Sequence, residues 1–248
     1  MDVETECTSF SIPPATLRQL IDRTAFSMAQ QDVRYYLNGM LFELGDEKLR
    51  TVATDGHRLA MCDADVAGLK DKAQVILPRK GVMELSRLLG DAAGDVQVTV
   101  GKNHVRILAG EVSFTSKLVD GKFPEYDRVV PKNSQKLIIA DRETLKQALG
   151  RVAILSNEKY RGIRIQLADG SFSMQGNNPE QEEAEEEVSV DYSGSELEIG
   201  FNVSYLLDVM NTLQGETVEI ALGDSNSSAL MADPAWRNAI YGVMPMRL

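Results

Sequence analysis

The residues best suited to acid–base chemistry lie in the segment TDGHRL, where Asp55 precedes His57 by two positions. A histidine beside a carboxylate could act as a general base in hydrolysis. Asp-Gly is also a common dipeptide of tight turns between strands, and we favour a turn at Asp55 and Gly56. No nucleophile elbow, phosphate-binding loop or Cys-x-x-Cys pair accompanies this segment. A binding protein is therefore favoured, with a hydrolase as the alternative.

A second candidate is the acidic run PEQEEAEEEV, which has six glutamates between Glu180 and Glu187. Carboxylates at this density could bind a metal ion or a basic partner. We favour a solvated strand whose charge discourages pairing at a sheet edge. His104 is the only other histidine, and it lies far from His57 in the sequence without metal-ligand spacing. Neither a metal site nor a cofactor is predicted.

An internal repeat indicates which elements position these residues. ATLRQLIDRTAFSMAQ (15–30) resembles ETLKQALGRVAILSNE (143–158), and PRKGVMELSRLL (78–89) resembles NVSYLLDVMNTL (202–213). Their apolar residues recur at helical spacing, which predicts two helices in each half of the chain. Alternating apolar residues predict strands after the second helix of each half and between the helices, with turn signals separating them.

The repeat predicts an α+β protein of two similar domains, residues 1–125 and 126–248. The boundary falls in FPEYDRVVPKNSQK (123–136), where prolines and polar residues cluster. Cys7 and Cys62 are the only cysteines, so we expect no disulfide framework and a cytoplasmic location. No apolar run is long enough for a membrane span, and no signal peptide is recognised at the start.

The charge distribution qualifies what the net charge implies about partners. A net charge of −11 argues against nucleic acid. Basic residues nevertheless outnumber acidic ones on the predicted helices taken together, so one face could still meet phosphate. The alternative is an ordinary helix surface, because lysine and arginine are good helix formers.

Several longer segments resemble one known family. They are QDVRYYLNGM, TVATDGHRLAM, FTSKLVDGKFPEYDRV, AILSNEKYRG, NNPEQEEAEEE, IGFNVSYLLDV and the terminal VMPMRL. From about residue 10 onward the chain resembles the bacterial sliding clamp, the β subunit of DNA polymerase III. The resemblance implies tandem DNA-clamp domains, each with two helices packed on antiparallel sheet. It implies a non-catalytic processivity factor that tethers polymerases and repair proteins to duplex DNA.

Family members have three clamp domains per chain and dimerise head to tail into a six-domain ring. This chain resembles the second and third domains only, so we expect either a truncated or a naturally short form. A short adaptor that binds clamp partners without encircling DNA is therefore the alternative function.

The resemblance implies a pocket for short linear motifs of polymerases, the clamp loader and mismatch-repair proteins. Methionine-rich walls suit such a pocket, because methionine adapts to varied apolar partners. In this interpretation His57 is pocket wall rather than catalyst, and Gly242 departs from the apolar residue common in the family and is expected to loosen the last strand. The matching positions are Leu37, Thr54, Gly56, His57, Arg58, Leu59, Pro124, Arg128, Val129, Asn202, Tyr205, Ser228, Val243, Met244, Pro245, Met246 and Arg247.

The resemblance also implies contacts to DNA that are independent of sequence. A sliding protein needs contacts to phosphate, because contacts to base edges would fix its position. Tyrosines could in addition stack on an unpaired base, the alternative being strand-forming aromatics at a domain surface. The matching positions are Arg34, Tyr35, Tyr36, Arg79, Lys80 and Arg87.

Ile154 and Leu155 match the subunit interface of complete clamps. In the family this surface meets the first domain of a neighbouring chain, and no part of this chain resembles that domain. We therefore expect a monomer at micromolar concentration, with a weak trimeric ring as the alternative. The expected partners are duplex DNA and motif-bearing proteins, without a membrane.

Overall fold

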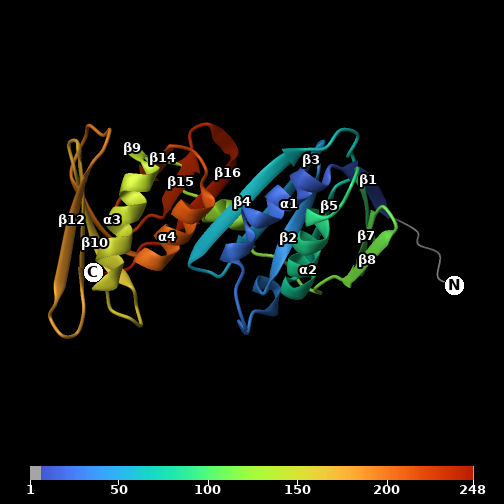
Figure 1. The fold of residues 1–248 in the computed structure, drawn as a ribbon, viewed down its shortest axis with the longest axis horizontal. Coiled ribbons are helices and arrows are strands. Elements are labelled where there is room, and N and C mark those ends of the chain that lie inside the picture. The colour runs from blue at the N-terminus through green and yellow to red at the C-terminus, as the bar shows by residue number, and fades with distance from the viewer. Residues whose placement is uncertain (1–6, 248) are drawn as a thin grey trace. The chain divides into compact units, whose positions relative to one another are not determined.

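The computed structural model describes residues 7–247, which divide into two compact units between Pro124 and Glu125 (Figure 1). Each unit packs two α-helices on antiparallel strands. Among the described residues, no helix is long and apolar enough to span a membrane.

Unit 1 contains two antiparallel sheets of four strands. One has the order β1-β6-β7-β8, and in the other β5, β2, β3 and β4 pair in that order. Along the chain its elements are β1 (Thr8–Ile12), α1 (Pro14–Asp22), the 3-10 turns η1 (Ala25–Ser27) and η2 (Tyr35–Leu37), β2 (Gly39–Gly45), β3 (Lys48–Thr54), β4 (Arg58–Asp65), β5 (Ala73–Pro78), α2 (Arg79–Gly90), β6 (Val96–Val100), β7 (His104–Ala109) and β8 (Val112–Lys117).

The core of unit 1 lies between its helices and both of its sheets. α2 buries Val82, Leu85 and Leu89, the spacing that the sequence pattern predicts for one helix face. Leu85 lines one small internal cavity together with Phe42 of β2 and Val98 of β6. The two sheets therefore share one apolar core, which holds α2 in a fixed position for the residues at its N-terminus.

Unit 2 repeats this arrangement. One sheet has the order β12-β11-β10-β13, and in the other β16, β15, β14 and β9 pair in that order. Its elements are η3 (Tyr126–Arg128), β9 (Lys136–Asp141), α3 (Arg142–Ile154), β10 (Gly162–Ala168), β11 (Ser171–Asn177), β12 (Glu183–Ser189), β13 (Leu197–Asn202), α4 (Val203–Thr212), β14 (Thr217–Leu222), β15 (Ala229–Asp233) and β16 (Trp236–Val243).

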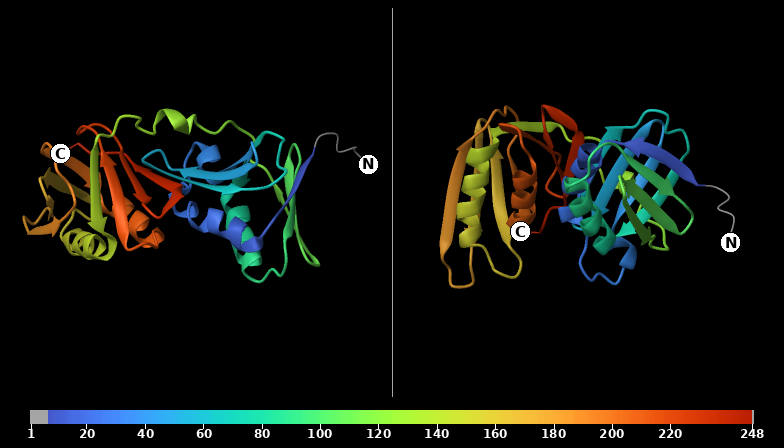
Figure 2. Two further views of the ribbon diagram at one scale, coloured as in Figure 1. Left: turned by 90° about the horizontal axis from the view of Figure 1, so that it is seen from above. Right: turned by 45° about the vertical axis from the view of Figure 1, so that its right-hand side comes forward.

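The first sheet of unit 2 has one face covered by helix and one face free of it. α3 packs on β11 and β12 and also against α4 (Figure 2). A Cβ on Gly176 would come within 2.9 Å of Val152 of α3, so this position of β11 faces the helix. Because side chains alternate along a strand, Gln175 and Asn177 point to the opposite face.

The predicted α+β fold, with two helices on antiparallel sheets in each half, is confirmed. The helix predicted over residues 15–30 is too long, since α1 ends at Asp22. The hydroxyl of Thr24 donates to Leu20 O at 2.8 Å and contacts Thr51 Oγ1 at 3.1 Å. A side chain bonded to the last turn in this way favours termination of the helix. Residues 25–27 then form a 3-10 turn.

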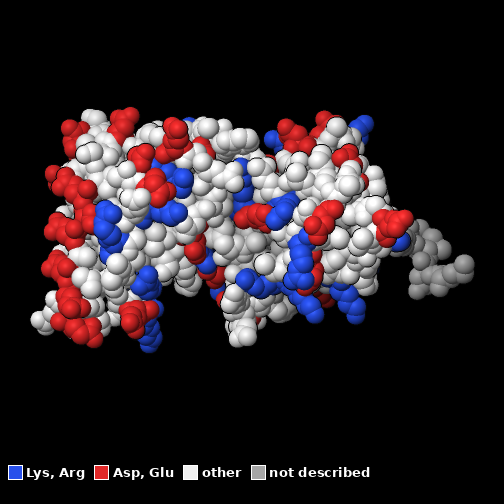
Figure 3. All heavy atoms as spheres, in the orientation of Figure 1, with Lys and Arg blue, Asp and Glu red and all other residues white. Residues whose placement is uncertain are grey.

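The acidic run is a strand, as predicted. Residues 183–189 form β12, which lies at the edge of its sheet, and acidic side chains gather over it (Figure 3). Glu183, Glu185 and Glu187 are exposed. Glu186 instead points to α3 and accepts from Arg151 Nε at 2.6 Å, and this arginine holds the pKa of Glu186 below its usual range. The exposed glutamates therefore keep the edge strand solvated, and Glu186 attaches β12 to α3.

Both cysteines lie in unit 1. Cys62 of β4 is buried, and burial raises the pKa of its thiol to about 11. Cys7 is partly exposed.

Candidate functional site

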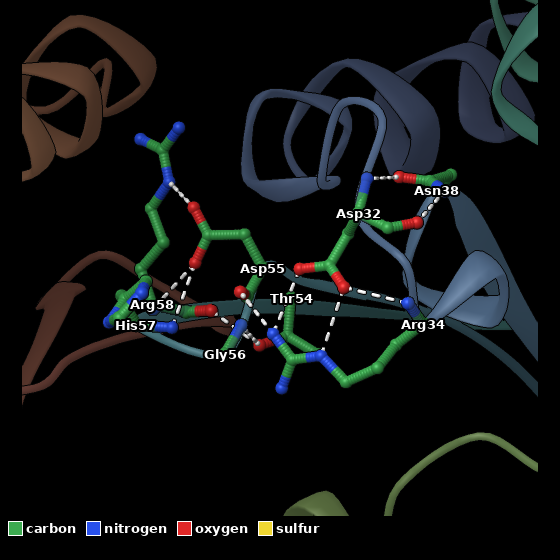
Figure 4. Close-up of polar contacts among 8 residues, drawn as sticks. All are labelled: Asp32, Arg34, Asn38, Thr54, Asp55, Gly56, His57 and Arg58. Atoms are coloured by element: carbon green, nitrogen blue, oxygen red, sulfur yellow. Dashed lines mark hydrogen bonds and ion pairs between the residues drawn. The ribbon is translucent and has the colours of Figure 1, made fainter.

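The turn from Thr54 to Leu59, which joins β3 to β4, is closed by its own side chains. Asp55 Oδ1 accepts from the backbone N–H of His57 at 2.9 Å and of Arg58 at 3.1 Å. Asp55 Oδ2 accepts from Arg58 Nε at 3.1 Å, and Thr54 Oγ1 donates to Arg58 O at 2.6 Å (Figure 4). The Asp55 carboxylate therefore shapes the turn that presents His57.

The loop of residues 31–38 lies against this turn. Asp32 and Arg34 form a two-point ion pair, with Nε to Oδ1 at 3.0 Å and Nη2 to Oδ2 at 2.9 Å. Arg34 Nη2 also donates to Asp55 O at 3.4 Å. A Cβ on Gly56, whose φ is +90°, would come within 3.0 Å of Arg34 Nη2. The predicted DNA-binding Arg34 and the predicted peptide-binding turn are therefore neighbours within unit 1 (Figure 4).

The ion pair fixes the protonation state of Asp32 as well as its position. The hydrogen bond from the Arg34 side chain, followed by that from the Arg34 backbone, lowers the pKa of Asp32 from 3.8 to about 2. The same contact raises the pKa of the Arg34 guanidinium. Arg34 thus carries its positive charge beside a permanent negative charge at neutral pH.

Asn38 joins this loop to the N-terminus of α2. Its side chain accepts from Asp32 N and donates to Asp32 O, both at 2.9 Å, and its carbonyl accepts from Arg79 N at 3.0 Å. Arg79 and Lys80 open α2, whose preceding residue Pro78 provides no side-chain cap. Backbone N–H groups at a helix start favour phosphate, and two basic side chains strengthen that preference.

The other predicted DNA contacts lie in the same loop and further along the same helix. Tyr35 is exposed, and its ring meets that of Tyr36 edge to face with centroids 5.8 Å apart. Arg87 lies in the last turn of α2, where its Nη1 is 3.4 Å from Glu84 Oε2. Basic side chains gather around α2 (Figure 3). Hydrogen bonds of Asn38 therefore link the loop that carries Arg34 to the start of α2, where Arg79 and Lys80 lie. Arg87 lies further along α2.

In unit 2 the hook, defined here as residues 243–247, continues from β16. Met246 N donates to Gly200 O of β13 at 2.8 Å, forming an isolated bridge. The Met246 side chain lies across Gly162, where a Cβ would stand 3.5 Å from its Cε. Met244 and Arg247 are exposed. The hook is thus fixed at one point and presents side chains on either side of it.

Asn202 and Ser228 lie within two residues of Gly200 and Ala229, which pair with residues of the hook. Asn202 caps α4, its Oδ1 accepting from Ser204 N at 2.9 Å. Tyr205 lies in the first turn of α4 and is partly exposed. Ser228 precedes Ala229, which is paired with Val243. Gly242 pairs with Leu230 in β16, a strand that runs unbroken to Val243.

The remaining predicted positions differ in exposure. Leu37, Leu59 and Val243 are buried, so their side chains support neighbouring residues and do not form the outer surface. Three further residues belong to the connection between the units: Pro124, Arg128, whose Nε is 2.6 Å from Glu125 Oε2, and the exposed Val129.

The predicted ring-interface residues end α3. Ile154 is 77% exposed, and Leu155, which follows the helix, is partly buried. Arg161, at a φ of +54°, donates from Nη1 to Ala153 O at 2.9 Å and from Nε to Ser204 Oγ at 3.1 Å. This arginine ties the exposed end of α3 to the start of α4.

Sequence reasoning did not select several residues that position the others, although it did expect the turn at Asp55 and Gly56. Asp32 and Asn38 hold the loop, while Gly162 and Gly200 admit the hook. The spacing Asp-x-Arg was an available signal for the loop. Glycine inside an alternating strand, which often marks close approach of another segment, was the signal for the two glycines. Among the described residues, no three His, Cys, Asp or Glu side chains are grouped to hold a metal ion.

Comparison with protein families matches two adjacent domains along the chain. Residues 11–125 match the DNA polymerase III beta subunit, central domain, and residues 127–247 match its C-terminal domain. Together the two matches account for nearly all of the described residues.

Individual relatives agree with the family match. The chain is 59% identical to a beta sliding clamp of Pseudomonas aeruginosa over 97% of its length and 55% identical to that of Escherichia coli K12 over 96%. It spans 66% and 65% of the length of these relatives, slightly less than two thirds. A crystal structure of a DNA polymerase sliding clamp from Pseudomonas aeruginosa with ligand, 59% identical, superposes with a TM-score of 0.95 over 97% of this chain and 66% of that one.

Proposed function

Because this chain belongs to the DNA polymerase III beta subunit family, the bacterial sliding clamps, we propose that it acts as a processivity clamp. In this role it tethers replicative and repair polymerases to duplex DNA and catalyses no reaction itself. The observation that carries the proposal is the hook. In it Met246 N donates to Gly200 O at 2.8 Å, which fixes the backbone, while the Met244 side chain stays 47% exposed and available to a partner.

The hook of unit 2 and the turn of unit 1 each have the character of a surface that recognises peptides. The turn is rigid, because Asp55 and Thr54 bond its backbone and side chains. The hook offers methionine side chains, which adapt to varied apolar partners. A rigid backbone with a few polar groups and adaptable apolar side chains suits a short anchored motif. We infer that both segments contribute to binding of partner motifs.

DNA binding in this proposal is electrostatic. Arg79 and Lys80 stand at the uncapped start of α2, and Asn38 connects them to the loop that carries Arg34. These residues are suited to contact phosphate, which carries no sequence information. The contacts are few and the net charge of the chain is −11, so affinity for free DNA is expected to be weak.

Encirclement of DNA requires copies of this chain to associate. Unit 2 supports such contact with Ile154, a large apolar residue that is 77% exposed at the end of α3. α3 packs on β12, whose outer edge is unpaired among the described residues and carries exposed glutamates. We expect this association to be weak, so that the chain is a monomer at micromolar concentration.

A processivity assay tests the proposed function. A bacterial replicative polymerase extends a primer on circular single-stranded DNA with its clamp loader, and a trap captures each polymerase that dissociates. Addition of this chain should lengthen the products of a single binding event, and a variant that lacks Met244–Leu248 should not. Products of equal length with and without the chain would refute the clamp role.

A further inference from the structure

A groove of about 490 Å³ lies in unit 2 beside the hook, on the helix-free face of the sheet β12-β11-β10-β13. Met246 and Arg247 line one side of it, and Gln175 and Asn177 of β11 line another. Its volume falls in the range of about 300–1,000 Å³ that is typical of ligand-binding clefts. Of the residues predicted to bind peptide or DNA, only those of the hook belong to it, and Glu183 of the acidic run also lines it.

Two glycines make the groove. Gly162 of β10 and Gly200 of β13 both line it, and their lack of side chains leaves room for the Met246 side chain over Gly162 and for the bond from Met246 N to Gly200 O. Arg164 of β10, which also lines the groove, bonds Glu198 at 2.8 Å, and Gln166 outside the groove bonds the same glutamate at 3.1 Å, so these side chains cover the sheet next to the glycines. Glycine in a strand commonly marks close approach of another backbone.

The groove is lined by side-chain amides without protein partners. Within residues 7–247, Gln175, Asn177 and Gln181 make no side-chain hydrogen bond to the protein. The adjoining hairpin is held by Asn178 instead, whose Nδ2 lies 2.7 Å from Glu182 Oε2 and whose Oδ1 accepts from Glu182 N at 2.9 Å. A primary amide both donates and accepts hydrogen bonds, which matches the alternating N–H and C=O groups of an extended peptide.

We propose that this groove binds the main chain of the residues that flank the clamp-binding motif of a partner protein. The inference rests on the proposed function, because Met246 and Arg247 belong both to the hook and to the groove wall. A peptide that leaves the hook along this wall enters the groove on the side of Met246 that faces Gln175 and Asn177. The amides then bind its backbone, so the flanking sequence needs little side-chain identity but must be extended and must possess N–H groups.

Calorimetry with a set of peptides tests this assignment. The reference peptide is a hexapeptide that begins with Gln and continues with Leu and Phe residues. Two longer peptides add four alanines at its N-terminus or at its C-terminus, and two others add four prolines instead. One of the alanine peptides should bind at least threefold more tightly than the reference, and its proline counterpart should show no gain, because proline has no N–H.

Variants assign the gain to the groove. Gln175→Met removes an amide from the groove, and Gln166→Met makes the same change on the same face outside it. The gain should disappear in Gln175→Met and persist in Gln166→Met, while both bind the reference peptide like the unaltered chain. If the reference binds but neither alanine extension helps, or if the gain survives in Gln175→Met, the groove assignment is wrong and the clamp role stands. If the reference peptide itself does not bind, the peptide-binding role fails first.

Discussion

Arg34 and Asp55 are joined by a hydrogen bond from the guanidinium Nη2 to the backbone carbonyl at 3.4 Å. Asp32 holds the same guanidinium by two shorter bonds, at 2.9 and 3.0 Å. A phosphate that attracts Arg34 therefore competes with Asp32 and with the turn that carries His57. Within unit 1 the contact therefore links Arg34, a proposed DNA-binding residue, to the turn that is proposed to bind peptides.

Gly56→Ala should weaken binding of both peptide and DNA. Its φ of +90° disfavours alanine, and the new Cβ would press on Arg34 at 3.0 Å. Gly68→Ala is the matched control, because Gly68 has a φ of +80° and no atom within 4 Å of the new Cβ. Both variants should lose about 1–2 kcal/mol of unfolding free energy. Only Gly56→Ala should lower affinity in calorimetry, and equal affinities in the two variants would contradict a role for the Arg34 contact.

Deletion of Met244–Leu248 should weaken binding of a motif peptide by at least ~1.4 kcal/mol, or tenfold. The reason is the loss of the Met244 and Met246 side chains and of the bond to Gly200. Met83→Ala, which removes an exposed methionine from α2, is the control for nonspecific apolar contact. Calorimetry measures each affinity, and unchanged binding after the deletion would locate the peptide site elsewhere.

Binding to duplex DNA should be independent of sequence and fall steeply with salt. Each phosphate contact contributes about −0.9 to the slope of log K against log salt, so Arg79→Ala with Lys80→Ala should flatten it by up to ~1.8. Lys70→Ala with Lys102→Ala removes the same charge from exposed positions outside the helices. Fluorescence anisotropy gives both slopes. A sequence-specific footprint, or equal slopes in the two double variants, would count against phosphate binding at α2.

The Asp32–Arg34 pair should contribute to stability only above the acid range. The pKa of Asp32 is about 2 in the folded chain against 3.8 normally, so its contribution is complete above pH 3.8 and is lost as pH falls through 2. NMR titration of the Arg34→Ala variant should show the pKa of Asp32 returning toward 3.8. Asp141, whose pKa is lowered mainly by Thr144, should not move and serves as internal control. An unshifted Asp32 would show that Arg34 is not its partner in solution.

Light scattering should find the 27.3 kDa monomer at micromolar concentration. Ile154→Ala should change the free energy of unfolding by less than ~0.5 kcal/mol, because the side chain is 77% exposed. Val152→Ala, on the buried face of the same helix, should be clearly destabilised. A stable species of ~82 kDa, three copies of the chain, would overturn the monomer, and its loss in Ile154→Ala with Leu155→Ala would favour a ring.

The spacing of apolar residues in the sequence predicted most of the fold, because the buried residues of the helices and strands follow the same spacing. The buried residues of α2 and the alternating residues of β6 and β14 follow the spacing that the sequence shows. The helix over residues 15–30 was wrong because apolar spacing continues past Asp22, while termination depends on the hydroxyl of Thr24. A bond from one side chain to the preceding turn leaves no periodic signal.

The candidate site was predictable only in part. Resemblance selected Arg34 and the hook, which carry recognisable side chains. It did not select Asp32 or Asn38, whose importance comes from bonds to backbone in a loop without repeating structure. The groove was missed for a similar reason, since Gly162 and Gly200 are far apart in the sequence and line the same hollow only through the strand order β10-β13.

Labelling of the buried thiol of Cys62 can report local opening of unit 1. A thiol with a pKa of about 11 is almost entirely protonated at neutral pH and shielded from reagents, so labelling of Cys62 must await exposure of β4. Unit 2 has no cysteine, and Cys7 is partly exposed outside β4, so its labelling does not depend on the opening of that strand. The labelling rate of Cys62 relative to that of Cys7 therefore follows the opening of one unit of a two-unit chain, without truncation and without an added probe.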